Sequence, residues 1–238
     1  MLKQIRVLIL IFILVPIYTF AQQSSLMEYK GEIGANIGTT TYFGQIGGET
    51  HSYSANFGFY FRKITADHIG VRINYEYVPL GANDSLSNNT TIKQRGFQFF
   101  RPFHELGFSI EYFLKNQQIK YNLIKFNPYV GVGMSYILNL PNDFNNFKTY
   151  NLLLDKYKDQ FIPIVAFPIN IGFQYPIKKD ISLYSELTYR YTTSDVIDNF
   201  GSSDPITTIN GTYIAAKNGN DKYMSFKIGI SKILNFRY

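Results

Sequence analysis

The stretch HIGVRINYEY, residues 68–77, decides the fold because its side chains alternate strictly between two kinds. The apolar side of the extended chain carries Ile69, Val71, Ile73, Tyr75 and Tyr77. The opposite side carries His68, Gly70, Arg72, Asn74 and Glu76. A strict period of two indicates a β-strand whose two faces meet different media.

Seven further stretches continue this pattern. Three of them alternate nearly as cleanly, ELGFSIEYF (105–113), DISLYSELTYRY (180–191) and MSFKIGISKILNFRY (224–238). The other four place Gly or a small polar residue at every second position, and they are 30–39, 54–62, 127–137 and 162–177. Pro168 predicts a bulge or irregular pairing in the last of these, because proline lacks the backbone N–H. The sequence therefore predicts eight strands and no long helix after the N-terminal segment.

The composition of the polar faces favours a membrane barrel over a soluble sandwich. In a sandwich these faces would meet bulk water and carry many Lys, Glu and Asp side chains. Here they carry Gly, Ser and Asn with a few charges of both signs, which suit the narrow, side-chain-filled interior of an eight-stranded barrel. The predicted polar network of the lumen consists of Glu32, Arg72, Glu76, Glu105, Glu111, Glu186, Arg190, Lys227 and Arg237.

The Tyr- and Phe-rich faces of such a barrel contact the lipids of the outer membrane, and closure of the sheet satisfies every backbone polar group. The chain has 20 Tyr and 21 Phe but no Trp, so Tyr would supply the interfacial aromatic girdles. We therefore predict an all-β fold, an eight-stranded antiparallel up-and-down transmembrane β-barrel, located in the cell outer membrane. A soluble periplasmic β-protein is the alternative.

The connections between the predicted strands alternate between short and long, as in barrels whose long loops face outward and whose short turns face the periplasm. The predicted external loops are 40–53, 78–102, 138–161 and 192–221. Structureless connections this long argue against a compact soluble domain. The turn 114–125 is long for the periplasmic side, and Lys115, Lys120 and Lys125 give it a positive patch. We expect a periplasmic partner to dock there, with an ordinary solvated turn as the alternative.

The N-terminal segment has the pattern of a secretory signal. Lys3 and Arg6 precede an apolar run, and Thr19-Phe20-Ala21 forms a small-x-small cleavage site. We therefore expect a cleaved signal peptide over 1–21 and a mature barrel domain over 22–238. The sequence contains no Cys, which excludes lipidation at the cleavage point and a disulfide framework.

The C-terminal residues and the net charge bear on the partners of the protein. Phe236 and Tyr238 close the chain in a way that resembles the terminal-strand signal read by the barrel assembly machinery, so that machinery is an expected partner. The formal net charge is +6, of which Lys3 and Arg6 supply two charges. Without a basic run or an RNA-binding motif, this excess does not predict nucleic acid binding.

Candidate catalytic and metal-binding residues are few. The three histidines, His51, His68 and His104, are predicted at different ends of the barrel, so they do not form a triad with a nucleophile and a carboxylate. The sequence has no Cys and no pair of His residues at a spacing that would indicate a metal site. Asp195, Asp198 and Asp204 lack the spacing of an EF-hand loop and are expected to be solvated, with calcium binding as the alternative. We therefore predict no cofactor and no enzymatic activity.

Several motifs resemble those of the PorG-type outer-membrane barrels of Bacteroidota. EIGANIGTTTYFGQIGG (32–48) is similar to their opening pattern E-x-G-x-x-x-G-x-x-x-Y-x-G, and FQFFRPFHELGFSIEYFL (97–114) to their central strand. FNPYVGVGMSY (126–136) resembles their F-x-P-Y-x-x-x-G strand. RYTTSDVIDNF (190–200) resembles a stretch usually written T-D-x-L-D-D-V, although Asn199 stands where a second Asp is usual.

The resemblance implies a non-enzymatic component of the type IX secretion and gliding apparatus, which engages the periplasmic ring of that machine. Nothing in composition or spacing points to secretion, so this expectation comes from the resemblance alone. Two alternatives from other classes stay open. One is a structural or adhesion barrel that acts through its extracellular loops, and the other is a lipid A-modifying barrel enzyme.

Overall fold

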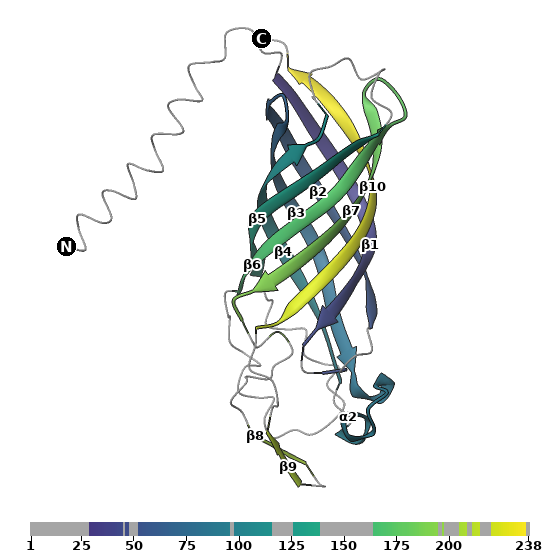
Figure 1. Ribbon diagram of the computed structural model, residues 1–238, viewed down its shortest axis with the longest axis vertical. Helices are drawn as coiled ribbons and strands as arrows, with labels where there is room; N and C mark the ends of the chain where they lie inside the picture. The colour runs from purple at the N-terminus through teal and green to yellow at the C-terminus, as the bar shows by residue number, and fades with distance from the viewer. Residues whose placement is uncertain are drawn as a thin grey trace, which may run out of the picture. The chain divides into compact units, whose positions relative to one another are not determined.

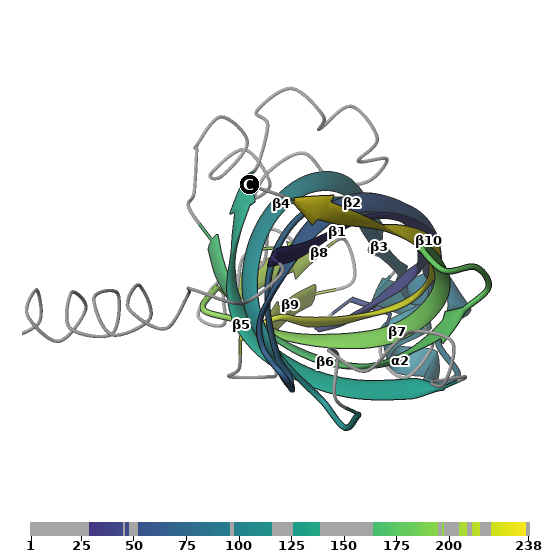
Figure 2. The same cartoon turned by 90° about the horizontal axis from the view of Figure 1, so that it is seen from above.

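The computed structural model forms a closed β-barrel, seen from the side in Figure 1 and along its axis in Figure 2. It describes residues 29–44, 46–47, 52–95, 98–115, 126–138, 164–194, 197, 205–208, 211–214 and 220–236. The barrel strands are β1 (Tyr29–Phe43), β2 (Tyr53–Ala66), β3 (Ile69–Asn83), β4 (Gln98–Phe113), β5 (Asn127–Leu138), β6 (Ile164–Pro176), β7 (Ile181–Thr192) and β10 (Lys222–Phe236). Contacts divide the chain into Lys30–Leu234, described here, and a unit of Met1–Tyr29 with Asn235–Tyr238.

Each strand of the barrel pairs with its neighbour in the chain, and β10 closes the sheet against β1. The ladders from β1 through β7 and between β7 and β10 are antiparallel. This arrangement confirms the prediction of an eight-stranded antiparallel up-and-down barrel. The predicted signal peptide lies outside the described residues.

The two faces of each strand differ as the alternation predicts. In β4 the outward Leu106, Phe108, Ile110 and Tyr112 are exposed, whereas the inward Glu105, Ser109 and Glu111 are buried. The same outward apolar surface continues around the barrel on Ile37, Phe59, Ile73, Val132, Ile171, Leu183, Phe226 and Ile228. Such a continuous apolar exterior is compatible with lipid and not with water.

A closed barrel with an apolar outside and a polar inside is the transmembrane architecture of the bacterial outer membrane, and the protein is therefore an outer-membrane β-barrel. In the part of the chain that the structure describes, no helix is both long and apolar enough to cross a membrane.

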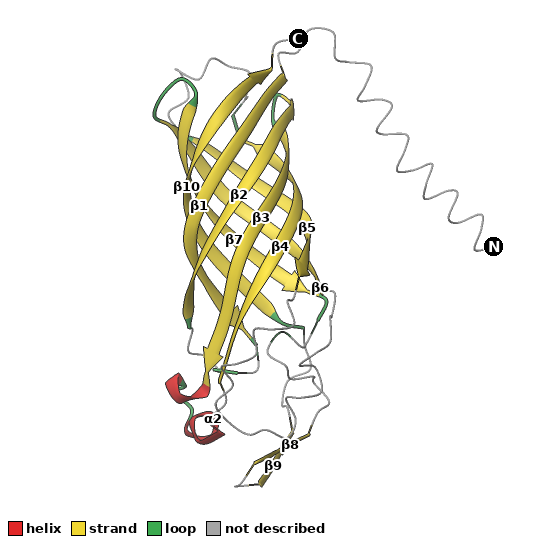
Figure 3. Cartoon of the chain, turned by 180° about the vertical axis from the view of Figure 1, so that it is seen from behind, coloured by secondary structure: helices red, strands yellow, loops and turns green. Residues whose placement is uncertain are grey.

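The connection expected at 78–102 is shorter than predicted, which corrects one boundary. β3 continues to Asn83 and β4 begins at Gln98, so the loop spans 84–97 and contains η1 (Asp84–Leu86) and α2 (Thr90–Arg95). Figure 3 shows β3 and β4 reaching toward these helices. The alternation disappears here because the inward Val78, Leu80 and Ala82 are apolar as well.

The strand ends Phe43, Leu138 and Thr192, from which the other predicted external loops continue, lie at the same end of the barrel as Asn83. β1 continues to Phe43 and β2 begins at Tyr53, so that loop is also shorter than the predicted 40–53. A two-stranded hairpin, β8 (Pro205–Thr208) and β9 (Gly211–Ile214), occurs within the predicted loop 192–221. Most of the predicted loop 138–161 lies outside the described residues.

Pro168 interrupts the ladder without shifting it. The pairing of β5 with β6 keeps one register from Val132↔Ile169 to Ser135↔Ala166, and the two intervening residue pairs form no bridge. On its other side, Pro168 pairs with Arg190 of β7 in an unbroken register. The predicted irregularity is therefore a local gap toward β5, whereas a register shift occurs between Ile64 and Ala66 of β2.

The lumen has two layers. Near the long loops it is apolar, and the buried side chains there are Tyr42, Ile46, Val78, Leu80, Ala82, Phe99, Phe103, Ile137, Ile164, Ala166, Ile197 and Tyr223. The remaining length is lined by polar and charged side chains such as Arg62, Glu111 and Lys227. Strand alternation alone does not distinguish the two layers, because both lie on the inward face.

Three inward tyrosines in the polar layer lie against glycines on the neighbouring strand. Tyr60 is paired with Gly34, Tyr129 with Gly172, and Tyr184 with Gly229. A Cβ added at these glycines would lie 2.3 to 2.6 Å from a ring carbon of its tyrosine. The missing side chain of each glycine is therefore what lets the ring lie flat on the barrel wall.

We expect Gly34→Ala to destabilise the barrel by about 1–3 kcal/mol, because the new methyl group overlaps the Tyr60 ring. Urea unfolding of the protein reconstituted in lipid vesicles measures this cost. In a Tyr60→Ala background the same substitution should cost much less, since the clashing ring is gone. An equal cost in both backgrounds would show that the ring is not the cause.

Candidate functional site

Nine charged side chains form one continuous chain across the lumen. In order of contact they are Glu32, Arg62, Glu111, Arg72, Glu186, Lys227, Glu76, Arg190 and Glu105. Each is at most 3% exposed. Acids and bases alternate along the whole chain, so every cation lies between two carboxylates.

The first half of the chain is built by two arginines. Arg62 on β2 lies 3.0 Å from Glu32 through Nη1 and 2.5 Å from Glu111 through Nε. Arg72 on β3 then bridges Glu111 at 3.0 Å and Glu186 at 2.5 Å. The β3 and β7 walls of the barrel are thereby joined through the lumen.

The second half continues from Glu186 toward the apolar layer. Lys227 on β10 lies 2.8 Å from Glu186 and 2.6 Å from Glu76. Arg190 lies 2.6 Å from Glu76 through Nη2 and 2.9 Å from Glu105 through Nε. Every second residue of a strand lies on the same face. Glu186 and Arg190, four positions apart on β7, therefore both point into the lumen.

Neutral donors complete the chain, which carries five carboxylates against four cations. Tyr60 and Gln174 donate to Glu32 at 2.6 and 2.8 Å. Tyr129 donates to Glu186 at 2.7 Å, and Tyr223 to Glu105 at 2.9 Å. A buried carboxylate is tolerated only when its oxygens are hydrogen-bonded and its charge is paired.

The network reaches every strand of the barrel. The charged members come from β1, β2, β3, β4, β7 and β10. β5 joins through the Tyr129 hydroxyl and β6 through the Gln174 amide. Side chains in direct contact thus cross the lumen in the polar layer, where an open pore would contain water.

Most members of this chain are predicted from the sequence, but their partners are not. Eight of the nine predicted lumen charges belong to it, and Arg237 lies outside the described residues. Arg62 was missed, although it continues the inward parity of Asn56, Gly58 and Tyr60. The inward Tyr60, Tyr129 and Tyr223 were missed because aromatic side chains were assigned to the lipid face.

The predicted partner-binding residues are only partly described. Lys115 is exposed just beyond the end of β4, and its backbone N–H donates to the Asn127 side chain at 3.3 Å. Lys120 and Lys125 lie outside the described residues, as does Tyr238. Phe236 is the last residue of β10.

His68 lies in the turn between β2 and β3, whereas His104 lies within β4, where it pairs with Tyr77. His68 Nδ1 donates to the Phe113 carbonyl oxygen at 2.8 Å. His104, on the outward face, shares a hydrogen bond of 2.6 Å with the Tyr75 hydroxyl. Over the described segments, no group of three His, Cys, Asp or Glu side chains is arranged to hold a metal ion. His51, Asp195, Asp198 and Asp204 lie outside those segments.

Two buried aspartates fasten the loops to the barrel at the apolar end. Asp221 accepts hydrogen bonds from the Tyr42 hydroxyl and from the backbone N–H of Ile197, the latter at 2.8 Å. Asp84 accepts one from the backbone N–H of Gly47 at 2.8 Å. Neither set of contacts is predictable from the sequence, because the partners Tyr42, Gly47 and Ile197 are far from the two aspartates along the chain.

Replacing Arg72 by Met should destabilise the barrel by about 3–5 kcal/mol, because Glu111 and Glu186 stay buried with half of their pairing lost. The measurement is the unfolding midpoint in urea after reconstitution in vesicles. Lys93→Met, on the exposed face of α2, is the matched control and should change stability by less than about 0.5 kcal/mol. Similar midpoints for the two variants would contradict a structural role for the ion-pair chain.

Comparisons with solved structures find other outer-membrane barrels at low identity. The N-terminal barrel domain of OprF from Pseudomonas aeruginosa is 11% identical with a TM-score of 0.47, and the match covers 86% of this chain and 97% of that one. Neisserial surface protein A is 11% identical with a TM-score of 0.44, covering 87% and 97%. Ail of Yersinia pestis, solved with a heparin analogue, is 10% identical with a TM-score of 0.45, covering 87% and 100%. Likenesses this distant carry no functional information for this chain.

A comparison with curated proteins finds no match. The family model described as "Domain of unknown function (DUF6089)" matches residues 5–234, which is nearly the whole sequence. The chain therefore belongs to the DUF6089 family.

Proposed function

We propose that this barrel is a non-enzymatic, membrane-anchored interaction module of the cell envelope that binds a protein partner on the periplasmic side. The observation that carries the proposal is the ion-pair chain, because a lumen crossed by direct side-chain contacts leaves only the two ends and the lipid face for function. The finer proposal is that the partner is the periplasmic ring of a type IX secretion system.

Transport through the barrel is disfavoured by both layers of the lumen. The polar layer is crossed by contacts of 2.5 to 2.9 Å that join charged side chains of β3 and β4 to those of β7 and β10 on the other side of the lumen. Beyond it, Phe99, Phe103 and Tyr223 are almost completely buried in the apolar layer. An eight-stranded barrel has an interior just wide enough for its own side chains.

Catalysis is disfavoured by what surrounds the described histidines. A lipid-modifying site would need a nucleophile and a carboxylate within hydrogen-bond reach of a His. His104 contacts Tyr75, and His68 contacts a backbone carbonyl group.

The secretion assignment is supported by the resemblance to PorG-type barrels together with the charge of the turn 114–125. Lys115 is exposed at the end of the barrel that carries the short turns, which faces the periplasm. An acidic surface on a periplasmic protein would complement this turn.

Adhesion through the extracellular loops is the second candidate. The observation in its favour is the hydrogen bonding of Asp84 and Asp221, which holds the bases of two loops in one conformation. A fixed loop base would present a defined binding surface to the exterior.

The occluded lumen predicts that the reconstituted protein conducts no ions. In planar bilayers we expect the current to stay at the baseline of the lipid, whereas a porin added to the same membranes should give stepwise openings. Reproducible openings from this protein alone would contradict the closed lumen and the function that rests on it.

Affinity capture tests the periplasmic partner. Tagged full-length protein, extracted from envelopes in mild detergent, should recover the ring proteins of the type IX system, detected by immunoblot. Exchanging Lys115, Lys120 and Lys125 together for Gln should reduce this recovery at least threefold, while Lys93→Gln at the opposite end should not. Absence of the ring proteins from the wild-type eluate would overturn the secretion assignment. Adhesion through the extracellular loops would be favoured if deletion of 192–221 abolished function while the variant with Lys115, Lys120 and Lys125 exchanged for Gln stayed active.

A further inference from the structure

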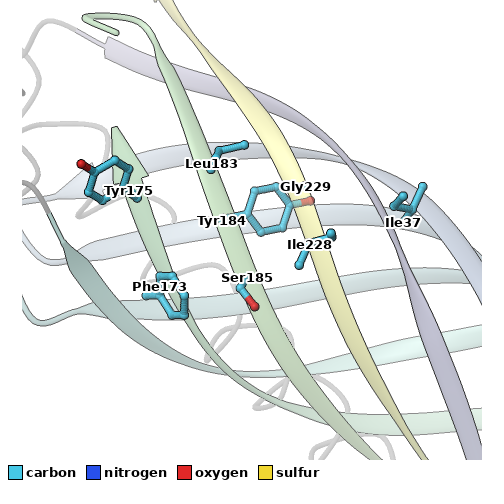
Figure 4. Close-up of a pocket in the computed structure, with 8 residues that line it drawn as sticks. All are labelled: Ile37, Phe173, Tyr175, Leu183, Tyr184, Ser185, Ile228 and Gly229. Carbon is cyan, nitrogen blue, oxygen red and sulfur yellow. The ribbon is translucent and has the colours of Figure 1, made fainter. Parts of the chain in front are cut away.

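The lipid-facing surface of the barrel is hollowed over β6, β7, β10 and β1 (Figure 4). The outward side chains around the hollow are Ile37, Phe173, Tyr175, Leu183, Ser185 and Ile228. Ser185 is the small residue in this apolar wall, and its register partners are Phe173 on β6 and Ile228 on β10. Gly229 and Tyr184, which pair with each other and belong to the inward face of the barrel wall, also line the hollow.

A group of lysines lies at the periplasmic edge of the same strands. Lys178 and Lys179 form the turn between β6 and β7, and Lys232 on β10 pairs with Ile181. All three are exposed, and Asp180 is the one acidic residue of that turn. Lys232 follows Ile228 by four residues on the same face of β10, which places it roughly 13 Å along the strand from the hollow.

We propose that the hollow and these three lysines form a binding site for an anionic glycerophospholipid of the periplasmic leaflet. An acyl chain would fill the hollow over Ser185 and Gly229, and the phosphate would contact the ammonium groups of Lys178, Lys179 and Lys232. The site does not depend on the proposed partner of the barrel.

Two independent features point to this ligand. The hollow is apolar and opens to hydrocarbon, which suits an acyl chain, whereas its edge offers three positive charges at the depth of the headgroups. Exposed lysines close to a membrane surface attract anionic lipids, and each one changes the affinity about fivefold. A zwitterionic lipid with the same chains would fill the hollow without this gain.

Native mass spectrometry of the full-length barrel in detergent tests the site with two probes of identical acyl chains, dioleoylphosphatidylglycerol and dioleoylphosphatidylcholine. We expect the wild-type protein to bind the anionic lipid at least tenfold more tightly. Exchange of Lys178, Lys179 and Lys232 for Gln should reduce this preference to less than about threefold. Lys93→Gln combined with Lys222→Gln, at the opposite end of the barrel, should leave it unchanged.

A second variant tests the hollow separately from the charges. Ser185→Phe should weaken the binding of both lipids about tenfold while keeping their ratio, because it fills the acyl-chain position and leaves the lysines in place. All the substituted side chains lie on the outer surface or in a turn, and circular dichroism verifies that the variants are folded. A wild-type protein without preference, a preference that survives the triple exchange, or unchanged binding to the Ser185 variant would each overturn the proposal.

Discussion

A charge inside a membrane protein must be paired, and this constraint organises the interior of the barrel. Nine ionised side chains meet it by alternating in sign, so that each of Arg62, Arg72, Lys227 and Arg190 separates two carboxylates. Desolvating an ion costs several kcal/mol, and only close partners with good geometry offset that cost. The observed contacts fix the distance between facing strands, and the tyrosines on the barrel wall fit within the remaining space.

The same constraint explains the opening motif of the chain. Its recurring positions, Glu32, Gly34, Gly38, Tyr42 and Gly44, are all even-numbered and lie on β1 or just after it. Glu32 begins the ion-pair chain, Gly34 makes room for Tyr60, and Tyr42 contacts Asp221. A Cβ at Gly38 would lie 2.1 Å from the Phe226 carbonyl oxygen, so this glycine permits close approach to β10. The motif therefore describes how the first strand of this chain fits the lumen.

The sequence predicted the strands wherever the two faces differ in polarity, as in 68–77 and 105–113. It failed where both faces are apolar, because Val78 and Leu80 give no alternation that would extend β3. The charges of the lumen were predictable from parity, but their pairing was not. Arg72 and Glu186 are 114 positions apart, and which residues meet across a barrel depends on strand tilt and register rather than on local pattern.

The ion-pair chain also bears on how the barrel reaches its final state. Arg72 on β3 meets Glu186 on β7, and Lys227 on β10 meets Glu76 on β3, so these contacts exist only after the sheet has curled into a ring. A partly curled sheet in the bilayer would leave those same charges facing hydrocarbon. Intermediates between the open sheet and the sealed cylinder are therefore unfavourable, and insertion and closure should proceed as one cooperative event.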